Sequence, residues 1–315
     1  SVRTVVAIDR RPTPSHAGGP SHVVDLASAD LKPLFDGASA VLHLAQADDN
    51  ARTDDAGLTH RVLEASGATG VAHVVLLSSA AAYGAWANNP VPLTEDAALR
   101  PNPGIGAIAA KAEVERAAME FREGHPGTTV TLLRPTVAVA AAGNSWLARV
   151  LSRSRLIPVA DDEPPAQFLD VADLAAAVDL ARRVRIDGPR NVAPDGWIDG
   201  DTARSLAGGG LRLRLPERVA LRLVRTGWSW GLSPTPPELL PYVVHPWVIA
   251  NDRLKADGWT PASSNEEALV ASHRPGPWLT LSPARRQELA LGVAGAVLVG
   301  AAVGLGAVVR RRIRR

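Results

Sequence analysis

The sequence contains no cysteine among its 315 residues. Disulfide bonds and thiolate metal sites are therefore excluded, and cysteine usage gives no information on the redox compartment. The eight histidines show no spacing typical of metal ligands, so we predict no metal site. Tyrosine is also scarce, because only Tyr83 and Tyr242 occur. Any chemistry that needs a phenol is limited to these two positions.

The body of the chain also lacks an excess of basic charge. The net charge is +2, but five arginines fall within the last six residues. Without these five the chain has 29 basic and 32 acidic residues, a net charge of −3. A nucleic-acid-binding protein needs a basic patch on its folded body, so we predict no nucleic-acid partner.

Charge is missing altogether from residues 289–309, which consist of Leu, Val, Ala and Gly. A helix of this length is roughly 30 Å long, about the thickness of the hydrocarbon core of a bilayer. Arg285 and Arg286 precede the segment and the arginine-rich tail at 310–315 follows it. We therefore expect a single transmembrane helix at 289–309, although a buried core helix is an alternative.

Apolar runs and amphipathic segments alternate along the first half of the chain. Runs of the first kind predict strands at residues 5–8, 21–24, 40–44, 73–77 and 129–133. Helical spacing predicts helices at residues 55–66, 107–120, 173–182, 251–257 and 265–272. This alternation is typical of an α/β fold with a doubly wound parallel sheet covered on both faces.

Several fragments of the sequence follow one another in the order in which similar fragments occur in a known protein family. They include VVAIDRRP at 5–12, VVLLSSAAAYG at 74–84, KAEVERA at 111–117, LLRPTVAV at 132–139 and QFLDVADLAAAV at 167–178. Together with NDRLKADGWTPASSNEEAL at 251–269, they resemble the extended short-chain dehydrogenase/reductase family of NAD-dependent epimerases and dehydratases. The resemblance covers roughly residues 1–272 and implies a Rossmann-type fold.

The family begins with a strand and a Gly-rich loop, and this chain begins at what resembles the second strand. We therefore expect a sheet that lacks the first strand and the loop, and that has a gap or a compensated edge. The expected domains are a dinucleotide-binding Rossmann-like part at 1–184 and a smaller, interleaved substrate lobe at 185–273. A juxtamembrane linker at 274–288, the transmembrane helix at 289–309 and the basic tail at 310–315 complete the predicted order.

The resemblance also implies a proton relay made of a Ser after a strand and Tyr-x-x-x-Lys on the next helix. Ser79 matches the Ser and Lys111 matches the Lys, but Ala107 stands in the Tyr position. An alanine can neither give nor take a proton. If hydride transfer occurs, Tyr83, Tyr242 or a water must replace the missing phenol, and Tyr83 is the candidate that the family places near the site.

Further residues match the family's cofactor contacts. Asp9 at a strand end matches the carboxylate that accepts the hydroxyls of the adenosine ribose, which favours NAD, whereas Arg10 or Arg11 keeps NADP open. Lys111 matches the ribose-binding lysine. The remaining positions are Asp25 and Leu26 for the adenine, Leu44 and Ala45 under the cofactor, and Thr136 and Val137 near the nicotinamide.

Two functions follow from these matches. The first is an NAD(P)-binding, epimerase/dehydratase-like oxidoreductase for a nucleotide-linked sugar or an envelope- or lipid-derived alcohol or ketone. The second is a non-catalytic, membrane-anchored protein that binds dinucleotide as a scaffold or sensor, and Ala107 motivates it. We expect membrane localisation with the body in the cytoplasm, where the cofactor is, and the resemblance also implies a homodimer.

Overall fold

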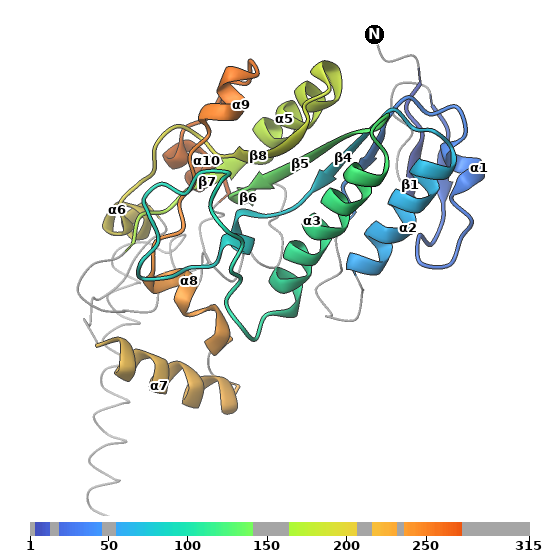
Figure 1. Cartoon of the computed structure of the whole chain (residues 1–315). Coiled ribbons are helices and arrows are strands. Elements are labelled where there is room, and N and C mark those ends of the chain that lie inside the picture. The colour runs from blue at the N-terminus through green and yellow to red at the C-terminus, as the bar shows by residue number, and fades with distance from the viewer. Residues whose placement is uncertain are drawn as a thin grey trace, which may run out of the picture. The chain divides into compact units, whose positions relative to one another are not determined.

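A computed structural model describes residues 4–12, 19–45, 55–140, 164–206, 216–231 and 236–272. All of them belong to one compact unit, Ser1–Ser272. Its centre is a four-stranded parallel sheet in the order β3-β4-β5-β8 (Figure 1). These strands are β3 (Val41–His43), β4 (His73–Leu77), β5 (Thr129–Pro135) and β8 (Gly188–Val192).

Helices cover both faces of this sheet. On one face lie α2 (Asp55–Ala68) and α3 (Gly106–Gly124), which pack against each other. The other face is covered by α5 (Val171–Val184), which begins where the Asp170 carboxylate accepts a hydrogen bond from the N–H of Ala172 at 2.7 Å. A side chain at the N-cap satisfies a backbone donor that the helix leaves unpaired.

The alternation of side chains along the strands explains the two covered faces. Val74 and Leu76 of β4 belong to the core beneath α2 and α3, whereas Val75 belongs to the core beneath α5. Successive residues of a strand point to opposite faces of the sheet. A strand that is apolar at every position is therefore buried on both sides, as the sequence predicts for a parallel sheet.

The parallel strands of the described residues fall into separate sheets. The strands β1 (Ala7–Asp9) and β2 (Ser21–Val23) pair in parallel with each other and form a sheet separate from β3. They are held to the rest by the short helix α1 (Lys32–Phe35), whose Phe35 packs into the core beneath α2, and by Arg61 of α2. The Arg61 guanidinium donates to the carbonyl of Leu26 at 2.9 Å and to that of Ala29 at 2.5 Å.

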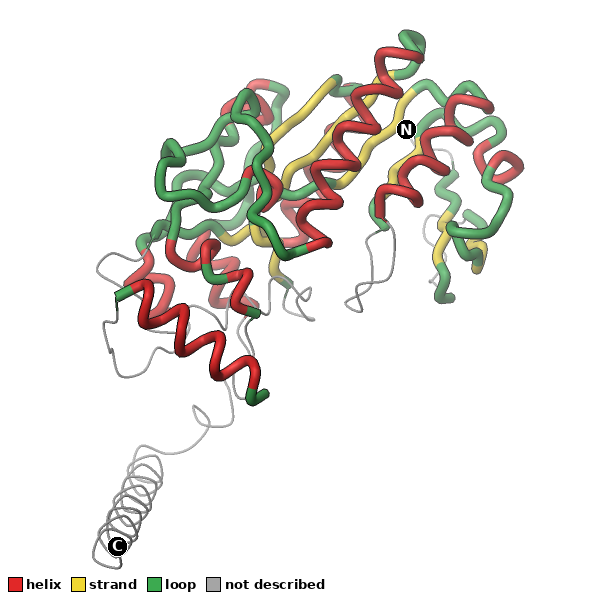
Figure 2. The backbone as a smooth tube through the Cα atoms, turned by 60° about the horizontal axis from the view of Figure 1, so that its bottom comes forward, coloured by secondary structure: helices red, strands yellow, loops and turns green. Residues whose placement is uncertain are grey.

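A second, smaller part is built from segments that return to the sheet from several places in the sequence. It contains a short parallel sheet of β6 (Val137–Val139) and β7 (Phe168–Asp170). The helical elements are η1 (Ala80–Tyr83), α6 (Gly200–Leu206), α7 (Glu217–Ser229), η2 (Pro237–Leu239), α8 (Pro241–Val244), α9 (Asp252–Ala256) and α10 (Asn265–Ser272). Figure 2 shows α7 at the periphery, away from the main sheet. Since β8 completes the main sheet from beyond residue 184, the two parts interleave, and the domain boundaries given above stay a prediction.

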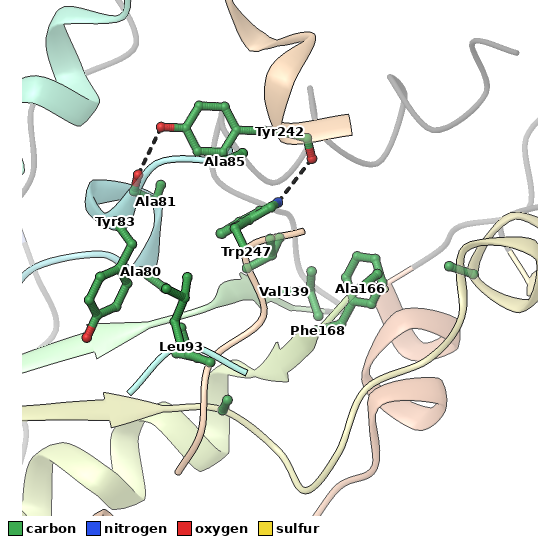
Figure 3. Close-up of a cluster of buried hydrophobic side chains, with 14 of the residues drawn as sticks. Ala80, Ala81, Tyr83, Ala85, Leu93, Val139, Ala166, Phe168, Tyr242 and Trp247 are labelled. Atoms are coloured by element: carbon green, nitrogen blue, oxygen red, sulfur yellow. Dashed lines mark hydrogen bonds between the residues drawn. The ribbon is translucent and has the colours of Figure 1, made fainter. Parts of the chain in front are cut away.

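Aromatic side chains fill the core of this smaller part. Tyr242 and Trp247 pack edge to face at 5.4 Å, and the Trp247 indole donates to the Tyr242 carbonyl at 3.0 Å (Figure 3). The Tyr242 hydroxyl donates to the carbonyl of Ala81 at 2.9 Å. Buried aromatic rings with a polar tip need such partners, and here they tie α8 to η1.

The prediction of a transmembrane helix is the main one that the structure corrects. In the described part of the chain no helix is both long and apolar enough to cross a bilayer. The longest of the described helices, α3, has 19 residues but carries charged side chains such as Lys111, Glu113 and Arg116. The prediction of a membrane-spanning fold, of a membrane partner and of membrane localisation is therefore wrong for the described residues. The segment 289–309 on which it rested lies outside them.

Candidate functional site

Two of the residues that the sequence singles out as catalytic, Ser79 and Tyr83, follow the carboxyl end of β4, and the third, Lys111, lies on α3. β4 ends at Leu77, and the chain then turns through Ser78 and Ser79 into η1. Ser79 caps η1, because its Oγ accepts the N–H of Ala81 at 3.2 Å. Its neighbour Ser78 is fully buried and donates to Glu115 Oε1 of α3 at 2.5 Å. Ser79 is thus the partly exposed member of the pair, at the end of the strand where ligands bind in this class of sheet.

Lys111 of α3 reaches across to α2. Its Nζ lies 2.8 Å from Asp55 Oδ2, and the two side chains are 11% and 7% exposed. His43 at the end of β3 is buried beside this pair, and its Nε2 lies 3.2 Å from Thr59 Oγ1. Three elements, β3, α2 and α3, therefore place an imidazole, a carboxylate and an ammonium together.

The electrostatics of this group are dominated by burial. The pKa of His43 is lowered from 6.5 to about 4, mainly by burial and next by the Lys111 charge, while the Asp55 charge opposes both. The imidazole is consequently neutral at neutral pH. Lys111 and Asp55 compensate each other's charge at a distance where Coulomb attraction is strong in a partly buried environment.

Tyr83 lies in a second buried group. Its hydroxyl donates to Asn191 Oδ1 of β8 at 2.8 Å and accepts from Arg134 Nη1 of β5 at 2.6 Å. The Arg134 guanidinium lies 4.9 Å from the centre of the Tyr83 ring and pairs with both oxygens of Glu115. Burial raises the pKa of Tyr83 to about 12, against an opposing contribution from Arg134. The phenol is therefore a poor proton donor or acceptor at neutral pH.

Ala107, one helical turn before Lys111, is exposed on α3. Residues four apart lie on the same side of a helix, so Ala107 presents a methyl group on the side of α3 that carries Lys111. Both tyrosines of the chain are engaged elsewhere, since Tyr242 donates to Ala81 and is fully buried. Neither phenol of this chain therefore lies beside Lys111 as a free hydroxyl.

The predicted cofactor contacts lie at the ends of β1, β2 and β3 and after β5. Asp9 ends β1 with an exposed side chain, and its Oδ1 accepts the N–H of Arg11 at 2.8 Å. Asp25 follows β2, is also exposed, and accepts the N–H of Ala27 at 3.0 Å. Leu26 presents its carbonyl to Arg61, as described above. Exposed carboxylates at strand ends suit the hydroxyl groups of a ribose, which donate hydrogen bonds.

The other predicted contacts differ in exposure. Leu44 and Ala45 follow β3 and are exposed, with Leu44 at 44%. Thr136 is buried, its N–H donates to the Val192 carbonyl at 3.0 Å, and Val137 opens β6. The predicted contacts thus come from several different elements of the fold. Their assignments to a cofactor stay predictions.

Sequence reasoning did not find Asp55, His43, Glu115 and Arg134. Asp55 is the first residue of α2, where an acidic residue is also expected from its interaction with the helix dipole. Glu115 has the helical spacing of a surface charge, but it is buried. One signal was available for Glu115, because it lies four residues after Lys111 and so on the same side of α3 as the predicted lysine.

Comparison with known proteins agrees with the resemblance seen in the sequence and with the observed fold. The model of the family described as "NAD dependent epimerase/dehydratase family" matches residues 2–192. No curated protein matches the chain. Among solved structures, MoeE5 in complex with UDP-glucuronic acid and NAD is 22% identical with a TM-score of 0.64, over 86% of this chain and 89% of that one.

Two further structures resemble the chain. UDP-glucose 4-epimerase from Thermus thermophilus, in complex with NAD, is 18% identical with a TM-score of 0.62, over 85% of this chain and 89% of that one. A double mutant of DesIV, a dTDP-glucose 4,6-dehydratase from Streptomyces venezuelae with NAD and DAU bound, is 14% identical with a TM-score of 0.63, over 86% of each chain. At these identities the likeness shows a shared fold.

Proposed function

The chain belongs to the NAD dependent epimerase/dehydratase family, and on that premise we propose that it binds NAD and a nucleotide-linked sugar without the family's phenol-dependent hydride transfer. Membership supports NAD as the cofactor, because the family is NAD-dependent. Relatives of similar fold have been solved with UDP-glucose or UDP-glucuronic acid bound, which supports a nucleotide sugar as the second ligand.

One observation carries the non-catalytic part of the proposal. The chain has two tyrosines, and the hydroxyls of both are committed to buried hydrogen bonds. Burial raises the pKa of each phenol to about 12. Removing a positioned acid–base group typically costs a factor of about 10²–10⁴ in rate. Ala107 therefore leaves the site able to bind a dinucleotide but deprived of the group that moves the proton.

The described residues fit the ribose parts of the cofactor. The exposed Asp9 carboxylate can accept two hydroxyl hydrogens of the adenosine ribose, and Lys111 can donate to the other ribose. Bound NAD would supply a nicotinamide that accepts or returns a hydride. The protein's own groups orient it, and Ser79 is left as a hydroxyl that can hydrogen-bond a sugar without removing its proton unaided.

Cofactor binding is tested with the full chain by calorimetric titration with NAD, NADH and NADP. We expect NAD and NADH to bind, and NADP to bind more weakly because a 2′-phosphate meets the Asp9 carboxylate. Asp9→Asn should weaken NAD binding by about 10- to 100-fold, since hydrogen bonds to a charged group contribute about 1.5–3 kcal/mol. Asp36→Asn, an exposed carboxylate at the end of α1, is the matched control and should leave the affinity unchanged.

Turnover is tested separately. The NAD-loaded chain is mixed with UDP-glucose or UDP-glucuronic acid, and the absorbance of the dihydronicotinamide is followed together with the sugar products. We expect binding of the sugar nucleotide without reduction of NAD. Reduction that disappears in Tyr83→Phe would overturn the proposal and support an oxidoreductase with Tyr83 as the acid. Absence of NAD binding would overturn the cofactor part.

A further inference from the structure

The ion pair between Lys111 and Asp55 changes what the lysine can do. In a relay of the family type, the lysine's positive charge lowers the pKa of a neighbouring phenol. Here the ammonium already has a carboxylate at 2.8 Å, and both side chains are nearly buried. Solvent and salt screen such a pair weakly, so the two charges largely cancel for any third group nearby.

His43, which lies beside this ion pair, experiences both of its charges. After burial, the Lys111 charge is the next contribution that lowers the pKa of this imidazole, and the Asp55 charge raises it. The two partners thus act on the same neighbour with opposite sign. A titratable group placed on the exposed side of Lys111 would likewise experience the opposing charges of the Lys111–Asp55 pair. It would not experience a full positive charge.

No other described charge around α3 supplies the free positive charge that Lys111 would provide without Asp55. From β5, Arg134 faces α3 but is bound to both oxygens of Glu115, which lies on α3 itself. From η1, Tyr83 is neutral and hydrogen-bonded within the same buried group. Among the described residues of α2, β3, β5 and η1 that pack here, the groups facing this region are therefore either neutral or paired.

We infer that Asp55 is a positioning residue that holds Lys111 in an internal ion pair, so that the site lacks both the phenol and the free cation that would activate one. This inference rests on the proposed function in one respect, which is that Lys111 belongs to the cofactor-binding site. The consequence is that restoring a phenol by Ala107→Tyr alone does not restore an acidic phenol. Two substitutions, Ala107→Tyr and Asp55→Asn, are required together.

The test is the ultraviolet titration of tyrosinate in the full chain without cofactor, so its result does not depend on NAD binding. The two native phenols, with pKa values raised to about 12, titrate after an introduced one. In Ala107→Tyr we expect the new phenol to titrate near the ordinary value of about 10. In Ala107→Tyr with Asp55→Asn we expect its pKa to fall by about one unit or more.

The matched control is Ala107→Tyr with Glu113→Gln, which removes the same charge from the exposed side of α3. It should give the same phenol pKa as Ala107→Tyr alone. The inference is overturned if the phenol titrates equally with and without Asp55, or if it is already depressed in the single variant.

A measurement on the unmodified chain covers the case in which Asp55→Asn does not fold. The chain has three lysines, Lys32, Lys111 and Lys255, so ¹³C-lysine NMR resolves each side chain. The ¹³C relaxation of Lys111 Cε should report an immobilised side chain, because its ammonium lies 2.8 Å from Asp55, whereas the exposed Lys32 should be mobile. A Lys111 side chain as mobile as that of Lys32 would overturn the ion pair and the inference.

Discussion

His43 illustrates how a single buried side chain couples this site to pH. It ends β3, its ring is 8% exposed, and its pKa is lowered to about 4, mainly by burial. In the unfolded chain the ordinary value of about 6.5 applies. At pH values between these two pKa values, the imidazole of His43 is protonated in the unfolded state and neutral in the native state. Stability contributed by His43 is therefore complete above pH 6.5 and decreases as the pH falls toward 4.

We predict that the free energy of unfolding decreases by up to about 3 kcal/mol from this residue as the pH falls from about 6.5 to about 4. His43→Gln should flatten the pH dependence in that window, because glutamine does not titrate. The measurement is urea unfolding at a series of pH values, with the exposed His60→Gln as control. An unchanged slope in His43→Gln would contradict the buried, neutral imidazole.

Tyr83 belongs to a network whose members depend on one another. Its hydroxyl joins Arg134 of β5 to Asn191 of β8, and Arg134 also donates to the Glu95 carbonyl at 3.1 Å. Buried networks of this kind are costly when one partner is lost, because the remaining polar groups are left unsatisfied. The geometry favours a structural role for this phenol.

Tyr83→Phe is expected to lower the free energy of unfolding by about 1–3 kcal/mol, because it leaves two buried partners without their hydroxyl. Tyr242→Phe removes one hydrogen bond to a backbone carbonyl and should cost about 1 kcal/mol, so it is the matched comparison. Urea unfolding followed by circular dichroism gives both values. Equal stability of Tyr83→Phe and the parent chain would contradict the network role.

At the scale of elements, hydrophobic pattern predicts the central strands well. The predicted strand 73–77 is observed as β4 with the same bounds, and 129–133 is observed within β5. The predicted helices at 107–120 and 173–182 lie within α3 and α5. These segments are long or strongly periodic, so local sequence is sufficient to specify them.

Three strands, β6, β7 and β8, were not predicted. β8 has the sequence GPRNV, which is poor in β-branched residues, and it becomes a strand because it pairs with β5 from Thr131 onward. β6 and β7 have three residues each and pair with each other although they are far apart in the chain. Strand propensity depends strongly on such tertiary partners, which a local pattern does not contain.

The interrupted sheet makes the β1–β2 pair the least supported part of the strand system. A two-stranded sheet is marginally stable by itself and depends on packing against other elements. We expect the backbone N–H groups of Ala7 and Val24, which are bonded to Pro20 and Asp9, to exchange with deuterium faster than those inside β4 and β5. Hydrogen exchange followed by mass spectrometry measures this, with β3 as the comparison at the edge of the main sheet. Equal protection of β1 and β4 would show that the pair is as stable as the central sheet.

At the scale of the whole molecule, three cores hold the described residues together. Two lie on opposite faces of the main sheet, and a third, which contains Tyr242 and Trp247, holds the smaller part. Tyr83 is in the third core through its ring and in the polar network of the sheet through its hydroxyl. Tyr83 is thus fixed by contacts between distant segments of the chain.

The sequence by itself determined the α/β class, the order of the central elements and the identity of the alanine at position 107. These follow from local periodicity and residue identity, which need no knowledge of neighbours in space. The tertiary structure alone decided that Asp55 meets Lys111 and that both tyrosines are engaged. Such contacts join residues 56 or more positions apart, and the fate of a polar group depends on which partner packing brings within hydrogen-bonding distance.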